Sequence, residues 1–268
     1  MAKTLVSYAN NYEDIVLFRL FGRQGFGRYV DVGASFPTLG SGTKLLYENG
    51  WSGINIEPSQ VEFEQLCAER SRDINVRTAV SDYEGTAILY SGAGDQYGLS
   101  SIDSDVAIRS MGSVHSMDEV PVTTLAHITD QYVEGPIDFL KVDVEGHEEQ
   151  VLRGADWNKF SPRVVVVEAT EPNSATLTFQ RWEPLLLDQG YVCVLFDGLN
   201  RFYAKAGDIE AKEVLSVPAN VHDNFESVHF KLLREHNYEL VERLVTCESR
   251  VSELQVRLGA LSRFAQTF

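Results

Sequence analysis

The sequence predicts an α/β fold in which helices cover both faces of a mostly parallel β-sheet. Between residues 28 and 205, short runs rich in β-branched residues alternate with longer amphipathic segments, and this alternation is typical of such sheets. Residues 163–169 contain four consecutive valines, which is the composition of a strand buried on both faces. With 44% hydrophobic and 23% charged residues, the 268-residue chain resembles an ordinary globular protein.

The expected elements follow from this alternation in chain order. We expect parallel strands at residues 28–32, 53–57, 74–80, 137–144 and 163–169, then a hairpin of strands at 191–196 and 201–205. Helices are expected at residues 43–49, 59–69, 147–153 and 175–188, with Pro184 kinking or splitting the last one. Residues 92–120 are rich in Gly, Ser and Asp, and a substrate-facing loop is favoured there over disorder.

Residues 229–268 follow a different period. Apolar side chains recur at alternating intervals of three and four residues, which is the heptad pattern of a coiled coil. A polar residue in such a row, here Asn237, fixes the register. We therefore expect a catalytic domain at 1–228 and a C-terminal helix at 229–268 that makes a homo-oligomer, rather than a helix packed on its own domain. The row comprises Phe230, Leu233, Asn237, Leu240, Leu244, Cys247, Val251, Leu254, Leu258, Leu261, Ala265 and Phe268.

The charge of the chain excludes several classes of partner. There are 23 Lys and Arg against 39 Asp and Glu, a net charge of −16, and the acidic excess lies in residues 1–228. Such a body repels nucleic acid and anionic membranes. The three cysteines lack CxxC spacing, and no apolar run has the length of a membrane span or signal peptide. We therefore expect a cytoplasmic protein without a membrane span.

The ends of the first two strands carry acids that suggest a ligand site, because ligands of parallel sheets bind beyond the carboxyl ends of the strands. Gly33 allows a sharp turn and close approach of the backbone to a ligand. Asp31 suits a cationic ligand or, alternatively, caps the turn. Glu57 is placed to accept ribose hydroxyls. The glycines that hold a pyrophosphate are absent after Gly33, so S-adenosylmethionine is favoured over a nicotinamide cofactor.

The fourth strand carries three charges that a buried strand tolerates only with partners or a function. Lys141, Asp143 and Glu145 alternate toward one face, and His147 follows. A histidine titrates near neutrality and suits acceptance of a hydroxyl proton, with Glu145 as its orienting partner. The alternative, equally weighted, is that His147 only caps a helix while Asp143 or Glu145 binds ligand.

Several segments together resemble the FkbM-type methyltransferases, including members associated with glycan biosynthesis. The segments are Lys141-Val142-Asp143-Val144-Glu145-Gly146-His147-Glu148 and residues 7–14, 29–34, 53–58, 196–203 and 217–223. The resemblance covers residues 7–225 and implies a class I methyltransferase (Rossmann-like) fold. It further implies S-adenosylmethionine as donor and O-methylation of a hydroxyl, above all a sugar hydroxyl of a glycan or glycoconjugate.

Asp143, Glu145 and His147 are the expected catalytic group, on the chemistry of the residues themselves. The resemblance assigns the cofactor-binding roles. Ser81 and Asp82 border the adenine, and Asp143 lies beside the methionyl end. The remaining cofactor-binding residues are Glu13, Asp14, Asp31, Gly33, Ala34, Glu57 and Pro58.

Metal use and the rival functions are less closely defined by the sequence. Some related sugar methyltransferases hold a divalent metal on acids at the tips of strands four and five. Asp143 and Glu168 occupy these places, but Ala169 stands where a second acid would follow, which counts against a metal. The rival functions are methylation of a non-sugar, polyketide-like hydroxyl, a nicotinamide oxidoreductase, and a non-enzymatic coiled-coil scaffold that keeps the fold.

Overall fold

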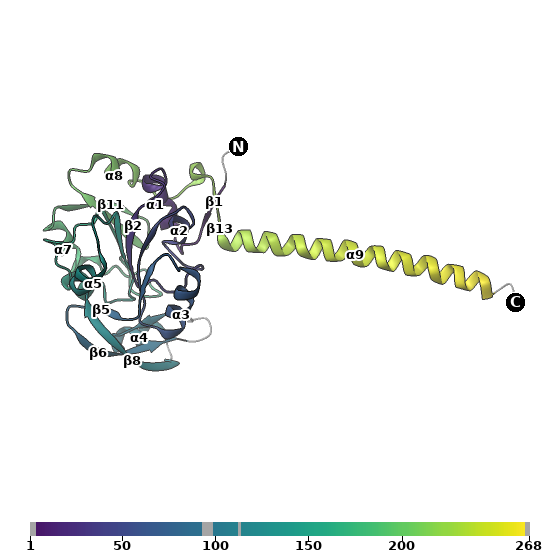
Figure 1. The fold of residues 1–268 in the computed structure, drawn as a ribbon, viewed down its shortest axis with the longest axis horizontal. Coiled ribbons are helices and arrows are strands. Elements are labelled where there is room, and N and C mark those ends of the chain that lie inside the picture. Colours follow the sequence, from purple (N-terminus) through teal and green to yellow (C-terminus); the bar gives the residue numbers. More distant parts are fainter. Residues whose placement is uncertain (1–3, 93–98, 112–113, 266–268) are drawn as a thin grey trace. The chain divides into compact units, whose positions relative to one another are not determined.

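The computed structural model describes residues 4–92, 99–111 and 114–265. It divides into two compact units, Ser7–Phe225 and a smaller one formed by Met1–Val6 with Glu226–Phe268 (Figure 1). The division into a domain at 1–228 and a separate helical segment at 229–268 stays a prediction.

The large unit is built on a seven-stranded sheet within the described residues. The order across it is β11-β12-β10-β9-β2-β3-β4, and β12 runs antiparallel to both neighbours while the other pairs are parallel. The strands are β2 (Arg28–Val32), β3 (Ser52–Ile56), β4 (Ile74–Val76), β9 (Phe139–Val142), β10 (Val164–Glu168), β11 (Tyr191–Phe196) and β12 (Asn200–Lys205). The carboxyl ends of the parallel strands therefore meet at one edge, as predicted.

Helices cover both faces of this sheet, which confirms the predicted fold class. One buried cluster joins the sheet to α1, α2 and α8, and the other joins it to α5, α6 and α7. Phe21 stacks on Phe139 in the first cluster, with ring centroids 5.9 Å apart. The helices are α1 (Glu13–Phe21), α2 (Lys44–Glu48), α3 (Gln60–Glu69), α5 (Leu125–Tyr132), α6 (Glu148–Arg153), α7 (Glu183–Leu187), α8 (Ile209–Val214) and the 3₁₀ helices η2 (Phe179–Arg181) and η3 (Val221–Asp223).

A second, four-stranded sheet corrects two sequence predictions. Its order is β5-β8-β6-β7, with β5 (Ala79–Ser81), β6 (Gly85–Ser91), β7 (Ser100–Ser101) and β8 (Ser116–Thr124). The single strand predicted at 74–80 is wrong, because β4 and β5 belong to different sheets. The loop predicted at 92–120 is also wrong in part, since β7, α4 (Ser104–Met111) and the start of β8 lie there. Residues 93–98 and 112–113 of that segment lie outside the described residues.

Two further elements are shorter than predicted. The helix expected at 175–188 is reduced to η2 and α7, because Pro184 lacks the amide hydrogen needed in a helix interior and stands at the start of α7 instead. The strand expected at 137–144 ends at Val142. Glu145 and Gly146 turn the chain with φ of 55° and 95°, so strand alternation does not govern the direction of Glu145.

The strands β1 (Leu5–Ser7) and β13 (Phe225–Ser227) pair with each other, and all but one residue of each belongs to the small unit, which also contains the 38-residue helix α9 (Val228–Ala265). A single continuous helix therefore spans most of the predicted heptad segment. Within the described ranges, no helix has the length and hydropathy required to cross a membrane.

Candidate active site

Gly33 joins the tips of two neighbouring strands at the carboxyl edge of the large sheet. It follows β2 with φ of 80°, a left-handed conformation that favours glycine. Its amide donates to the Ile56 carbonyl over 3.0 Å. A Cβ at this position would lie 1.7 Å from the carbonyl oxygen of Asp143. A side chain at residue 33 would therefore force β2 and β9 apart at the predicted ligand edge.

Lys141 lies among three acids at this edge. Its side chain is buried, and its Nζ donates to Asp143 Oδ2 over 2.7 Å. Asp31 and Glu13 add to the effect of Asp143 in raising the Lys141 pKa against burial. Asp31 Oδ2 accepts from Thr43 Oγ1 at 3.0 Å, while the buried Oδ1 has no hydrogen-bond partner among the described residues. The lysine thus offsets part of the repulsion among carboxylates that burial would otherwise leave uncompensated.

The two acids at the start of α1 have different surroundings. Burial raises the pKa of Glu13 to about 7, with Lys141 opposing the shift. Burial also raises the pKa of Asp14 to about 6. The Asp14 oxygens, however, accept from Ser7 Oγ at 2.6 Å and from the Tyr8 amide at 2.7 Å. Glu13 therefore belongs to the Lys141 group, whereas Asp14 anchors the segment before α1.

Glu57 follows β3 and is buried at the same edge. Its Oε2 accepts from the Ser35 amide at 2.9 Å and its Oε1 from the Ser59 amide at 2.8 Å. Burial raises its pKa to about 7. Ala34, in the turn after β2, is buried, and Pro58, which follows Glu57 in the chain, is half-buried. The two backbone donors orient the carboxylate between the turns that follow β2 and β3.

His147 is held by a residue that is distant in sequence. Its Nε2 lies 3.0 Å from Ser81 Oγ, and within the part of the chain that the structure describes its buried Nδ1 has no hydrogen-bond partner. Ser81 Oγ also lies 3.3 Å from Oδ1 of the exposed Asp82. Burial lowers the His147 pKa, which favours the neutral, proton-accepting ring. The helix predicted at 147–153 begins one residue later, at Glu148, and the side chain of His147 makes no capping hydrogen bond.

A second group of carboxyls adjoins the first through Asp143. Burial, then the like charges of Asp143 and Glu148, raises the pKa of Glu145 to about 8. Burial raises the pKa of Glu148 to about 7, although this side chain accepts from the Gly146 amide at 3.0 Å. Burial and the same acids raise the Glu168 pKa well above its ordinary value. No hydrogen bond joins Glu145 to His147 in the described part of the chain, so the observed partner of His147 is Ser81.

The segment after β7 covers the turn between β9 and α6. Ser101 Oγ donates to the Glu145 carbonyl over 3.0 Å, and a Cβ on Gly146 would lie 3.1 Å from Val106 of α4. The chain from 99 to 111 therefore contacts the candidate catalytic turn.

The structure also identifies polar residues that sequence reasoning missed. Thr43 and Ser35 contact the predicted acids only after folding, and nothing in their sequence context marks them. Among the described residues, buried polar atoms without hydrogen-bond partners also lie beside Glu168, which the sequence had placed at the tip of β10: Thr170 Oγ1, Thr178 Oγ1 and Asn200 Oδ1. Asn200 pairs with Glu168 across the sheet, and the Thr178 amide donates to the Ala169 carbonyl, contacts that only the folded chain makes.

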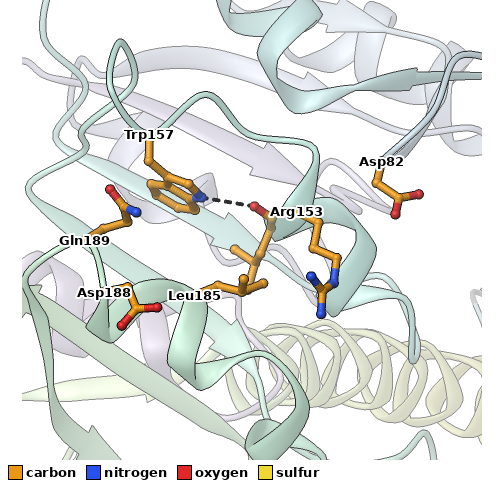
Figure 2. Close-up of a pocket in the computed structure, with 7 residues that line it drawn as sticks. Asp82, Arg153, Trp157, Leu185, Asp188 and Gln189 are labelled. Atoms are coloured by element: carbon orange, nitrogen blue, oxygen red, sulfur yellow. Dashed lines mark hydrogen bonds between the residues drawn. The ribbon is translucent and has the colours of Figure 1, made fainter.

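A separate surface cleft of about 350 Å³ shares one residue with this site. Figure 2 places Trp157 and Gln189 toward one side of it and Asp82 toward the other, and Trp157 Nε1 donates to the Leu152 carbonyl over 3.0 Å. The lining residues are Asp82, Leu152, Arg153, Trp157, Leu185, Asp188 and Gln189. Because Asp31, Glu57 and Asp143 do not line it, we do not assign the cleft to the strand-tip site.

The arrangement of the large sheet defines a class of protein. Numbered along the chain, its strands lie in the order 3-2-1-4-5-7-6 with the seventh antiparallel, and the polar site lies at the carboxyl edge. This is the class I methyltransferase fold. Among the described residues, no three His, Cys, Asp or Glu side chains are grouped so as to hold a metal ion.

Comparison with known proteins identifies the family. Residues 31–193 match the methyltransferase FkbM domain model, and the chain belongs to this methyltransferase family. A search of curated proteins found no match.

Solved structures are similar at low identity. The fibrillarin/Nop5p complex matches with 14% identity and a TM-score of 0.37, covering 68% of this chain and 73% of that one. The Escherichia coli protein yhhF, assigned as a methyltransferase, matches with 11% identity and a TM-score of 0.38, covering 76% and 90%. A Clostridium thermocellum protein assigned as an rRNA-methylase matches with 8% identity and a TM-score of 0.35, covering 69% and 95%. The fold assignment rests on the strand order rather than on these scores.

Proposed function

We propose that this methyltransferase uses S-adenosylmethionine to methylate a hydroxyl group, most specifically a sugar hydroxyl of a glycan or glycoconjugate. The observation that carries the proposal is the backbone contact at Gly33, which brings the acidic tips of β2 and β9 together beside Glu57. The family supports methyl transfer, and the donor and acceptor are our inference.

The residues at this edge fit S-adenosylmethionine. The buried Asp31 Oδ1 lacks a hydrogen-bond partner among the described residues, and a polar group of the bound cofactor would donate to it. Asp31, Gly33 and Glu57 would hold the cofactor, and Ala34 and Pro58 lie in the same turns. Ser81 and Asp82 would border its adenine. Glu13 and Asp143 would lie near the cofactor, and Asp14 would position the segment before α1. When bound, the cofactor supplies an electrophilic methyl group on a sulfonium cation, and acids around it suit that charge.

In this proposal His147 accepts the proton of the acceptor hydroxyl. With Nε2–H donating to Ser81 Oγ, the lone pair remains on the unpartnered Nδ1. The lowered pKa keeps the ring neutral at physiological pH. Alignment of the two reactants supplies most of the rate, and the base adds about 10²–10⁴-fold. In the same proposal Glu145 is the second candidate for the base, and Asp143 lies beside the methionyl end of the cofactor.

A neutral glycan acceptor is consistent with the charge of the protein. The net charge of −16 disfavours polyanions. Residues 196–203 and 217–223 also resemble members associated with glycan assembly, and Asp197 caps the turn in the first segment by accepting from the Asn200 amide at 2.7 Å. We also retain a cytoplasmic location and self-association through α9 as proposals, and we propose no role for a metal.

Mass spectrometry of acceptor mixtures tests the proposal. The protein and S-adenosylmethionine should add one methyl group to a member of a panel of free, nucleotide-linked and lipid-linked sugars. His147→Gln should lower turnover by about 10²–10⁴-fold and leave S-adenosylhomocysteine affinity nearly unchanged. The matched control is His127→Gln, since His127 is exposed and pairs with Glu84, and it should retain full turnover.

Other outcomes would favour the rival functions. Methylation of aglycone hydroxyls instead of sugars would support a polyketide-like acceptor. Stabilisation by NAD instead of S-adenosylhomocysteine would support an oxidoreductase, and binding of neither would support a scaffold. Full activity in His147→Gln would refute the base assignment.

A further inference from the structure

Helix α9 carries an apolar row, interrupted by Asn237, whose described apolar side chains are exposed. Phe230, Leu244 and Leu258 are 59%, 59% and 69% exposed, and the described row from residue 230 to residue 258 lies on this one helix. At 1.5 Å per residue the 38-residue helix is about 57 Å long. An isolated helix without a packed face is marginal in water, so a partner for this row is expected.

We infer that α9 pairs with α9 of a second copy as a parallel, in-register, two-stranded coiled coil. The inference rests on the proposed self-association and is independent of methyl transfer. In heptad notation Phe230 is an a position and Leu233 a d position. Three features are typical of parallel dimers: Leu at most d positions, Val251 at an a position and Asn237 at another a position. A second apolar row, Tyr238, Val241 and Val245, is short and ends at Glu248.

The charges beside the row select the direction of pairing. Three of the g positions are arginines, Arg243, Arg250 and Arg257, and the others are His229, His236 and Phe264. In an antiparallel pair each g row faces the g row of the partner, so these arginines repel one another. In a parallel pair each g residue faces the e residue five positions later on the partner, so Arg243 faces Glu248 and Arg250 faces Gln255. For Arg243 and Arg250 the parallel arrangement therefore exchanges arginine–arginine contacts for one ion pair and one neutral contact on each side.

Glu248 has no basic neighbour on its own side of α9. Its neighbours three and four residues away are Leu244, Val245, Val251 and Ser252, none of which is basic. Neither Glu248 nor Arg243 makes an ion pair in the described structure. The other g–e contacts add no attraction: His236 faces Val241, Arg257 faces Ser262, and His229 faces Arg234, which already pairs with Glu226 of its own chain.

Sedimentation equilibrium of the full chain tests the charge argument. Wild type should be a dimer. Glu248→Arg should weaken it about tenfold, since it replaces two attractive contacts by two repulsive ones. Glu242→Arg is the matched control, because it makes the same charge change at the outer f position and should leave the dimer unchanged. Arg243→Glu combined with Glu248→Arg should restore the wild-type affinity.

Disulfide cross-linking tests direction and register. Cys247 and Cys67 are exposed. In a Cys67→Ser background, diamide should take two electrons and two protons from the facing Cys247 thiols and link the chains. With Leu240→Cys and Cys247→Ser added, a parallel register again predicts a link, whereas an antiparallel pair separates the two residues 240. A monomer, a trimer, failure of the residue 240 link or equal effects of the two glutamate reversals would overturn the inference. None of these results bears on methyl transfer.

Discussion

Gly33 provides the sharpest test of the strand-tip site, because its replacement by alanine perturbs one contact. The left-handed conformation at φ 80° costs an L-residue about 1–2 kcal/mol. The new methyl carbon would lie 1.7 Å from the Asp143 carbonyl oxygen, whereas a carbon–oxygen contact requires about 3.3 Å. Relieving an overlap of about 1.6 Å in a packed region costs a further ~1–3 kcal/mol. Gly33→Ala should therefore destabilise the protein by about 2–5 kcal/mol.

Gly135→Ala is the matched control for backbone strain. Gly135 has φ of 85°, and a Cβ there would meet nothing within 4 Å, so its replacement should cost only the conformational term of about 1–2 kcal/mol. Urea unfolding of both variants, followed by tryptophan fluorescence, measures the difference. Calorimetric titration with S-adenosylhomocysteine should show weakened binding for Gly33→Ala alone. Equal costs for the two variants, or unchanged affinity in Gly33→Ala, would refute the reasoning.

The remaining predictions concern buried charges. The Glu145 pKa is raised in the folded protein to about 8, so the folded state binds the extra proton and stability falls as pH rises from about 4.5 to 8. In urea unfolding, Glu145→Gln should therefore leave stability unchanged at pH 5 and increase it by about 1–2 kcal/mol at pH 8.5. No gain in stability at pH 8.5 would contradict this. Glu57→Ala should weaken S-adenosylhomocysteine binding about tenfold or more in titration calorimetry, since a bidentate acceptor is lost, while an unchanged affinity would remove Glu57 from the cofactor site. Arg70 is fully buried with its Nε 3.0 Å from an Asp73 carboxylate oxygen, so Arg70→Leu should lower the free energy of unfolding in urea by about 3–5 kcal/mol. The control Arg153→Leu, at an exposed ion pair, should lower it by under about 1 kcal/mol. Equal losses of stability would contradict a special contribution of the buried pair.

Much of the fold could be predicted because its signals are local. The strands at β2, β3, β10, β11 and β12 are marked by apolar runs and turn residues. The four-stranded sheet escaped prediction because its strands take their partners from far along the chain. β6 and β8 pair from Gly85 opposite Val122 to Ser91 opposite Ser116, and the exposed polar side of β8 weakens its apolar pattern.

The candidate site divides in the same way. Strand ends that are predictable from sequence place Asp31, Glu57 and Asp143 at one edge. The pairing of His147 with Ser81, 66 residues earlier, depends on how the second sheet lies beside α6, and the sequence suggested Glu145 as its partner instead. A hydrogen bond requires a specific distance and direction, and residue spacing does not carry that information across separate elements.

By itself, the sequence determined the layered α/β architecture, the acids at the strand tips and the heptad row of the last helix, because each depends on residue types at fixed short spacings. Only the tertiary structure decided that Lys141 lies among Glu13, Asp31 and Asp143, and that Gly33 contacts the Asp143 backbone. These contacts join segments that are distant in the chain, and burial at their meeting point sets the pKa of each acid.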